Sequence, residues 1–454
     1  MLSKIIAAVK NKHFLSLAGN GIMSVVGMVT IGLLARVLPI RDLGIWVFFQ
    51  TSFVTVDTFR TGFLVVAFIK FFSGTDAERS AEVTGSMWFL AILISLGLAL
   101  INIPVYFLLP HISDVSIAFF LKWYGGVFII TIPTFVAACL QQGKQRFDRI
   151  LYIRIATQGT ILLLIIVLTF MHRISLQTLL YIYYAANAFA SIYVLIMGWT
   201  DLKTIAKRSK KAMKEIYDFG KFSVTSTLSS NLFRTSDVYI INFALGAAGP
   251  AAVAIYNLGG SLTQIIEIPL RSFVATGLPA LSQAFNQDNR AEFVLTLKKY
   301  AGMLTLVLVP VSLAAVFLAD YAIGLIGGGK YMHTEAANVF RLFMTFSLLN
   351  PAERFFGVSI DAINKPRINL YRILTMLAAN IITDLIGIYI THNIYGVTVA
   401  SIFPTLVGLI YGYKVVKGYY PFSFLSIYKQ GWKEIKVFLN THLFKSKKVE
   451  QVEA

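Results

Sequence analysis

The chain has 454 residues, of which 57% are hydrophobic and only 14% are charged. A soluble domain usually carries about 25% charged residues, so the composition excludes an ordinary soluble protein and predicts an all-α protein that crosses a membrane many times. The net charge of +18 would also suit a nucleic-acid-binding protein, but the positions of the basic residues, described below, argue against a nucleic-acid partner.

Apolar runs of about 20 residues, each long enough to cross a bilayer as a helix, recur along the chain. The first is too long for the apolar region of a signal peptide, so we expect it to be retained as a span. The connections are short, which argues against an enzyme with a large domain outside the membrane, and we predict no catalytic residue and no metal site. The twelve predicted spans are residues 14–38, 43–69, 83–109, 117–141, 150–171, 177–200, 222–246, 250–280, 300–320, 336–360, 369–390 and 394–416.

The lysines and arginines predict the orientation of these spans. With the N-terminus inside, the outer segments hold only five of the 40 basic residues, namely Arg36, Arg41, Lys122, Arg173 and Lys330. Five more fall within spans, namely Arg60, Arg234, Arg271, Arg341 and Arg354, and the remaining 30 lie in inner segments. This distribution follows the positive-inside rule and predicts that both termini face the cytoplasm.

The spans divide into two sets of six. We expect an N-terminal lobe over residues 1–200, a basic cytoplasmic linker over 201–221, a C-terminal lobe over 222–417 and a cytoplasmic tail over 418–454. Shifting the second half back by 210 residues aligns LGIWVFFQTSFVTVDTFRTGF with VAIYNLGGSLTQIIEIPLRSF and places Asp57 on Glu267 without a gap. Two halves that both begin inside predict parallel repeats related by an axis along the membrane normal.

The tail carries its own pattern. Apolar residues recur there at spacings of three and four with lysines between them, which predicts a basic amphipathic helix on the inner leaflet. These apolar residues are Leu425, Tyr428, Trp432, Ile435 and Leu439. The basic linker has a similar composition, and we expect it at the membrane surface as well.

Three pairs of opposite charges lie inside predicted spans. Asp57 and Arg60 are three residues apart, as are Arg234 and Asp237, while Glu267 and Arg271 are four apart. Each spacing places both members on one helical face. An ionisable side chain at mid-span costs at least about 2.5–3.5 kcal/mol on insertion scales, so each must face a partner or a wet cavity.

Two interpretations of these pairs remain open. In the first, each acid only neutralises its neighbouring arginine and the pair holds helices together. In the second, the pairs line a shared aqueous cavity, where arginines would bind an anionic group such as a phosphate. The second interpretation predicts Arg60, Arg234, Arg271, Asn231, Gln264 and Arg354 as substrate-binding residues, and Asp57, Asp237 and Glu267 as residues that orient the arginines or bind a coupling cation.

Several motifs resemble the oligosaccharide and polysaccharide flippases of the MOP superfamily, the Wzx-like branch, over nearly the whole chain. They are LLARVLPIRDLGIW, PTFVAACLQQGKQRF, SDVYIINFALGAAGPAAVAIYNLGGSL, GLPALSQAF, LIGGGKYMHTEAANVFRL and DAINKPRINLYRI. The chain differs from many members in span 2, where Arg60, Thr61 and Gly62 replace an Asp-Leu-Gly motif and the acid stands at Asp57.

The resemblance implies two six-helix lobes in a V-shaped transporter that alternates between inward and outward access. It implies a substrate that is an oligosaccharide linked to undecaprenyl pyrophosphate, moved across a bacterial cytoplasmic (inner) membrane for O-antigen, lipopolysaccharide or other polysaccharide biosynthesis. The expected driving force is a gradient of H⁺ or Na⁺, with no other cofactor. We expect a monomer among membrane lipids, associated with glycan assembly enzymes. The alternative is an antiporter of the multidrug and toxin extrusion (MATE) branch, which shares the fold.

Overall fold

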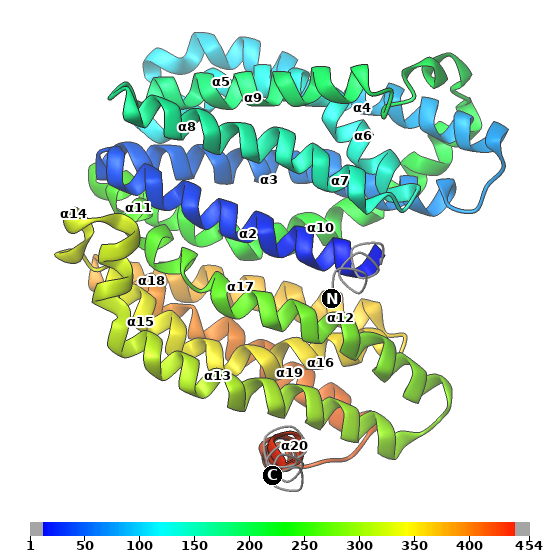
Figure 1. Ribbon diagram of the computed structural model, residues 1–454, viewed down its shortest axis with the longest axis vertical. Helices are drawn as coiled ribbons and strands as arrows, with labels where there is room; N and C mark the ends of the chain where they lie inside the picture. The colour runs from blue at the N-terminus through cyan, green and yellow to red at the C-terminus, as the bar shows by residue number, and fades with distance from the viewer. Residues whose placement is uncertain (1–11, 441–454) are drawn as a thin grey trace, which may run out of the picture. The chain divides into compact units, whose positions relative to one another are not determined.

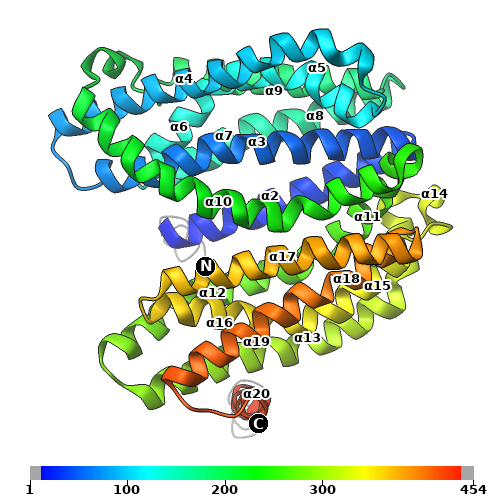
Figure 2. The ribbon, with the colours of Figure 1, turned by 180° about the vertical axis from the view of Figure 1, so that it is seen from behind.

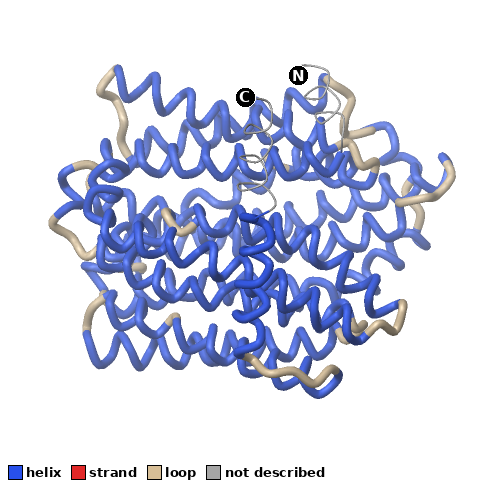
Figure 3. The backbone as a smooth tube through the Cα atoms, turned by 60° about the horizontal axis from the view of Figure 1, so that its bottom comes forward, coloured by secondary structure: helices blue, strands red, loops and turns tan. Residues whose placement is uncertain are grey.

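The structure of the protein is a computed structural model, which describes residues 12–440. Helices joined by short loops make up this part of the chain, and it contains no strand (Figure 3). The all-helical fold class is therefore confirmed. The first half comprises α2 (Lys12–Val37), α3 (Ile40–Phe72), α4 (Ala77–Leu108), η1 (Leu109–His111), α5 (Val115–Ile130), α6 (Ile132–Gly143), α7 (Phe147–Arg154), η2 (Ile155–Gly159), α8 (Thr160–Phe170) and α9 (Leu176–Ile196).

The second half begins after the turn η3 (Leu202–Lys207), which belongs to the basic linker. It comprises α10 (Lys210–Ala244), η4 (Gly246–Ala248), α11 (Gly249–Ser261), α12 (Gln264–Asn286), α13 (Arg290–Gly327), α14 (Gly329–Met332), α15 (Ala336–Phe346), η5 (Ser347–Leu349), α16 (Asn350–Ala362), α17 (Pro366–Thr391), α18 (Ile394–Ala400), α19 (Ile402–Tyr419) and α20 (Leu425–Leu439).

Each of the twelve predicted spans coincides with a helix or with a broken helix. By length and composition, seven helices of the described residues are apolar enough to cross a membrane, and two broken pairs bring the number to nine. The three remaining predicted spans are α2, α10 and α15–α16. In α2 only Gly21–Val37 is apolar. The first turns of α10 are charged, and η5 interrupts the helix between α15 and α16. These features explain why hydropathy alone recognises fewer spans.

The helices fall into two compact units. Unit 1 contains residues 12–258 and 326–333, and unit 2 contains residues 259–325 and 334–440. The division falls later in the chain than the linker at 201–221, where the predicted lobes meet, because α10 lies along α3 (Figures 1 and 2). A Cβ on Gly220 would lie 2.4 Å from the Phe63 carbonyl oxygen, and one on Gly62 would lie 2.9 Å from Thr227 Cβ. Small residues thus allow the two helices close contact.

The short piece 326–333 joins unit 1 through its contacts with the end of α2. Arg36 Nε donates to the Ile326 carbonyl at 3.3 Å, and Lys330 Nζ donates to the Leu38 carbonyl. Partial burial at this contact lowers the pKa of Lys330. The basic linker is likewise held by unit 1, since Ser86 Oγ of α4 donates to the Ser209 carbonyl at 3.3 Å. The linker therefore packs on α4 through its own backbone, a contact that the sequence pattern does not predict.

The two halves repeat the same local structure around one turn. The helix α6 has 12 residues and α16 has 13, each with a proline in its first turn, and each is followed by a turn and a new helix. The turn contains Gln145 at φ 54° in the first half and Asn364 at φ 58° in the second. These residues are 219 positions apart, whereas the repeat predicted in span 2 has an offset of 210. The difference of nine positions corresponds to a small insertion in the second half.

The tail helix α20 is partly different from the predicted one. Its lysines are exposed as expected, but the residues that face unit 2 are Ile427 and Gly431, and Trp432 is 53% exposed. The reason is a close helix crossing, in which a Cβ on Gly431 would lie 2.3 Å from the backbone of Gly302 in α13. The glycine, which contributes little to a hydrophobic pattern, sets the face that docks. Residues 441–454 of the predicted tail lie outside the described part.

Candidate functional site

Arg60 lies at the centre of a polar network inside unit 1. Its side chain is only 2% exposed, and its guanidinium forms an ion pair with Asp57 at 2.7 Å. Arg60 Nε also donates to Asp57 Oδ1 at 2.8 Å, while Nη1 donates to Ser95 Oγ in α4 at 3.1 Å. The predicted spacing on one face of span 2 therefore produces a real contact between acid and base.

The same guanidinium reaches the break in span 4. Arg60 Nη2 donates to Thr131 Oγ1 at 3.3 Å, and Thr131 is the residue between α5 and α6, whose axes differ by 54°. The guanidinium carbon also lies 4.4 Å from the centre of the Phe135 ring and 5.4 Å from that of Phe128. A guanidinium held by a carboxylate, two hydroxyls and two aromatic faces has its charge well compensated. In this conformation Arg60 positions α3, α4 and α6 relative to one another.

Three further predicted residues lie on α10, beside α3. Thr55 of α3 donates its hydroxyl to Asn231 Oδ1 at 3.1 Å. Tyr256 of α11 donates its hydroxyl to Asp237, and Arg234 is exposed. Unit 1 therefore brings Asn231 and Asp237 into hydrogen bonds with neighbouring helices, and the Arg234 side chain is exposed on α10.

The other four predicted residues belong to unit 2. Glu267 and Arg271 of α12 form an ion pair at 3.6 Å, with the acid 25% and the base 45% exposed. Gln264 is the first residue of α12, and it is half-buried, as is Arg354 in α16. Unlike Arg60, Arg271 keeps nearly half of its side chain exposed.

A second buried pair escaped the sequence analysis. Arg372 of α17 forms an ion pair with Glu353 of α16, and the two side chains are only 6% and 13% exposed. Arg372 Nε also donates to Asn369 Oδ1 at 3.0 Å. A Cβ on Gly357 would lie 2.4 Å from Arg372 Nη2, so this glycine makes room for the guanidinium. The orientation count placed Arg372 with the inner segments although it lies near the start of the predicted span 369–390, and Pro366 six residues earlier is a typical first residue of a helix.

The two buried pairs occupy comparable places in the two units. Each joins an arginine to a broken span: Arg60 contacts the break between α5 and α6, and Arg372 contacts Glu353 in the first turn of α16, just after η5. Buried charges are costly unless they are paired and hydrogen-bonded, and both arginines satisfy this condition. Each unit thus contains one paired arginine that fixes the helix following a break.

The carboxylate of Asp384 in α17 is also buried. This fully inaccessible carboxylate accepts a hydrogen bond from Asn380 Nδ2 at 2.8 Å. The helix α17 packs closely on α18 here, since a Cβ on Gly387 would lie 2.4 Å from the Gly396 carbonyl oxygen. Close contact with α18 explains the burial.

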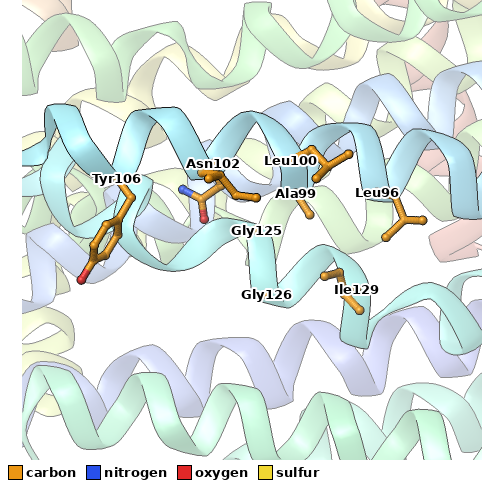
Figure 4. Close-up of a pocket in the computed structure, with 9 residues that line it drawn as sticks. Leu96, Ala99, Leu100, Asn102, Tyr106, Gly125, Gly126 and Ile129 are labelled. Atoms are coloured by element: carbon orange, nitrogen blue, oxygen red, sulfur yellow. The ribbon is translucent and has the colours of Figure 1, made fainter.

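A cavity of about 320 Å³ lies between α4 and α5, and none of these charged residues lines it. Its walls are mainly aliphatic, with Asn102 and Tyr106 as polar members, and Gly125 and Gly126 leave space on α5 (Figure 4). None of the nine predicted site residues lines it. Among residues 12–440, no group of three or more His, Cys, Asp and Glu is placed to hold a metal ion. The described arrangement offers ion pairs and hydrogen bonds to polar groups inside the membrane.

Comparisons with known proteins agree with this architecture. A family model described as "Polysaccharide biosynthesis protein" matches residues 9–285, and one described as "MatE" matches residues 227–386. A curated relative from Haloferax volcanii, the "Probable low-salt glycan biosynthesis flippase Agl15", is 23% identical over 246 residues. That match covers 53% of this chain, and it spans about half (50%) of the relative's length.

Two solved structures have the same fold. An inward-facing multidrug resistance MATE family transporter of the MOP superfamily superposes with a TM-score of 0.74 at 13% identity, covering 87% of this chain and 94% of the other. The lipid II flippase MurJ in an inward closed conformation superposes with a TM-score of 0.71 at 15% identity, covering 95% and 92%. At these identities the likeness concerns the fold, and it confirms the predicted MOP-type architecture.

Proposed function

Because the chain belongs to the polysaccharide biosynthesis protein family, we propose that it is a flippase that moves a lipid-linked anionic oligosaccharide across the membrane. The glycan headgroup crosses the membrane among the polar side chains of the helices, while the lipid tail stays in the bilayer. The protein is multi-pass, and its positive-inside pattern supports a topology with both termini in the cytoplasm. It acts by binding and release, without covalent chemistry on the substrate.

The observation that carries this proposal is that the arginines inside the spans differ in their exposure. Arg60 is buried and fully engaged, whereas Arg271 is 45% exposed and Arg234 is exposed. An accessible guanidinium in a membrane protein is well suited to bind a phosphate or pyrophosphate through two parallel hydrogen bonds. In this proposal each unit offers its own groups for the anionic headgroup: Arg234 and Asn231 in unit 1, and Arg271, Gln264 and Arg354 in unit 2.

For Arg60 the geometry favours the first interpretation left open by the sequence. All its nitrogen atoms donate to side chains of unit 1, so in this conformation it neutralises Asp57 and positions α6. Asp57 is 21% exposed. A carboxylate that is accessible on one side and paired on the other suits reversible binding of a coupling H⁺ or Na⁺. We propose Asp57 as the coupling residue of unit 1, and Glu267 as its counterpart in unit 2.

The antiporter alternative is less well supported. Its family model matches residues 227–386 only, and an exported organic cation would need carboxylates with uncompensated charge. Asp57, Glu267 and Glu353 each form an ion pair with an arginine.

We therefore propose an undecaprenyl-pyrophosphate-linked glycan, destined for a surface polysaccharide such as O-antigen, as the substrate in a bacterial inner membrane.

Reconstitution tests this function directly. Purified protein in vesicles is given a fluorescent lipid-linked oligosaccharide, and its movement between leaflets is followed with and without H⁺ and Na⁺ gradients. Arg234→Gln and Arg271→Gln should each reduce the flipping rate at least tenfold. The exposed Arg173→Gln, in the loop before α9, is the matched control and should flip normally. Wild-type rates in both span variants would refute the anion-binding role, and gradient-driven export of an organic cation without glycan flipping would support the antiporter.

A further inference from the structure

The tail helix α20 is an integral part of unit 2. Its Ile427 is fully buried, and its Gly431 meets Gly302 of α13 at backbone distance, since a Cβ on Gly302 would lie 2.1 Å from the Ile427 carbonyl oxygen. Near its other end, Glu434 forms an ion pair with Lys299 of α13 at 3.5 Å. Three successive turns of α20 therefore contact one helix of the bundle.

The segment that leads into α20 is anchored as well. Phe422 and Phe424 pack against Tyr413 of α19, with ring centroids 5.5 and 5.6 Å away. The Tyr413 hydroxyl donates to the Phe422 carbonyl at 3.1 Å, and Phe356 of α16 completes the aromatic cluster. The position of α20 is consequently fixed at both its start and its middle.

The opposite face of α20 combines lysines with large apolar side chains. Leu425 is 67% exposed and Trp432 is 53% exposed. Lys429, Lys433 and Lys436 are exposed too, and their spacing of three and four places them on the same face as Leu425 and Trp432. Lys436 Nζ lies 5.5 Å from the Trp432 ring. Exposed tryptophan beside lysine is typical of helices that lie in a membrane interface.

The position of α20 along α13 agrees with an interface. Figures 1 and 2 draw α20 end-on, beside α13, whose axis runs across the view. The two helices meet at Gly302, twelve residues after α13 begins at Arg290, which is about 18 Å along the helix. This point is close to the start of the predicted span at 300–320. The tail helix thus crosses the bundle at the level where the positive-inside rule puts the inner membrane surface.

We propose that this exposed face of α20 is a binding site for anionic lipid headgroups of the inner leaflet. Lys429, Lys433 and Lys436 bind the lipid phosphates, and Leu425 and Trp432 enter the boundary between headgroups and acyl chains. The positive charge of the face argues for an anionic surface, and each lysine near such a surface strengthens binding roughly fivefold. Because α20 is fixed to α13, the site holds unit 2 against the inner leaflet. It is independent of the transported substrate.

The test uses the fluorescence of Trp432 in the full-length protein. The protein is placed in nanodiscs that contain increasing fractions of brominated phosphatidylglycerol or brominated phosphatidylcholine, and quenching by bromine is measured. Subtracting the signal of Trp432→Phe isolates this tryptophan from the other four. Brominated phosphatidylglycerol should reach half-maximal quenching at a severalfold lower mole fraction, and this preference should disappear in high salt.

Matched variants separate a headgroup site from general effects of charge. Replacing Lys429, Lys433 and Lys436 together with Gln should abolish the preference, and replacing them with Arg should preserve it. Removing the same charge from the linker, with Gln at Lys203, Lys207 and Lys211, should leave it unchanged. Equal quenching of the wild type by both lipids would overturn the proposal in favour of simple immersion. Absence of quenching by either lipid would overturn it in favour of a protein partner on this face.

Discussion

Arg60 Nη2 donates a hydrogen bond to Thr131 Oγ1, 3.3 Å away, at the residue where α5 ends and α6 begins. Thr131 Oγ1 in turn donates to the Val127 carbonyl at 2.9 Å, in the last turn of α5. One side chain from span 2 therefore connects to both sides of the break in span 4. Arg60, paired with Asp57, thereby contributes to the packing of unit 1.

Removing the arginine should strongly destabilise the protein. In Arg60→Met the carboxylate of Asp57 loses its buried partner, and breaking a buried pair in this way costs about 3–5 kcal/mol. Reversible unfolding in mixed micelles with increasing SDS measures the change. The double variant with Asp57→Asn added should recover most of the loss, because no unpaired charge remains. Equal stability of Arg60→Met and the wild type would mean that the pair does not support the break.

The second buried pair offers a test that leaves both charges in place. The change Gly357→Ala puts a Cβ 2.4 Å from Arg372 Nη2, so the guanidinium, which pairs with Glu353 through Nη1, must shift. Overpacking of this kind costs about 1–3 kcal/mol, and thermal unfolding followed by fluorescence should show a lower midpoint. The matched control is Gly418→Ala on α19, where nothing lies within 4 Å of the new Cβ. It should be neutral or slightly stabilising, since Ala favours a helix.

The exposed pair should behave differently from the buried ones. Arg271 is 45% exposed and lies 3.6 Å from Glu267, and accessible ion pairs contribute at most about 1 kcal/mol. We expect Glu267→Gln to leave unfolding in SDS within that limit. In the flipping assay the same variant should lose most of its dependence on an ion gradient, because the carboxylate is the proposed coupling group. A large loss of stability with normal coupling would assign Glu267 to packing.

Hydropathy and spacing predict much of this structure. Apolar runs locate all twelve helical segments, and the spacing of three between Asp57 and Arg60 predicts their contact. Such patterns describe one helix at a time. They cannot show that Gly220 lets α10 approach α3, or that the guanidinium of Arg372 fits beside Gly357 in another helix. These contacts depend on the absence of a side chain, which produces no hydrophobic or charge signal.

The tail helix illustrates the same limit. Its hydrophobic periodicity predicts a face that contains Leu425 and Trp432, and these residues are exposed in the structure. The face that docks contains Gly431 instead, because two glycine backbones can meet there. The periodicity predicted the exposed face of α20, which carries Leu425 and Trp432. The face that contacts α13 could be identified only from the three-dimensional structure.

The close contact between α3 and α11 in unit 1 provides a last prediction. A Cβ on Gly44 would lie only 1.5 Å from the Pro250 carbonyl oxygen. Because the neighbouring atom belongs to the backbone, a side chain at position 44 must push the two helices apart. Gly44→Ala, Gly44→Ser and Gly44→Val should therefore lower the thermal midpoint progressively, and the flipping rate should fall in the same order. The matched series at Gly27 on α2, where a Cβ meets nothing within 4 Å, should show no dependence on side-chain size. If the thermal midpoint and the flipping rate did not change with side-chain size in either series, the contact between α3 and α11 would not be required.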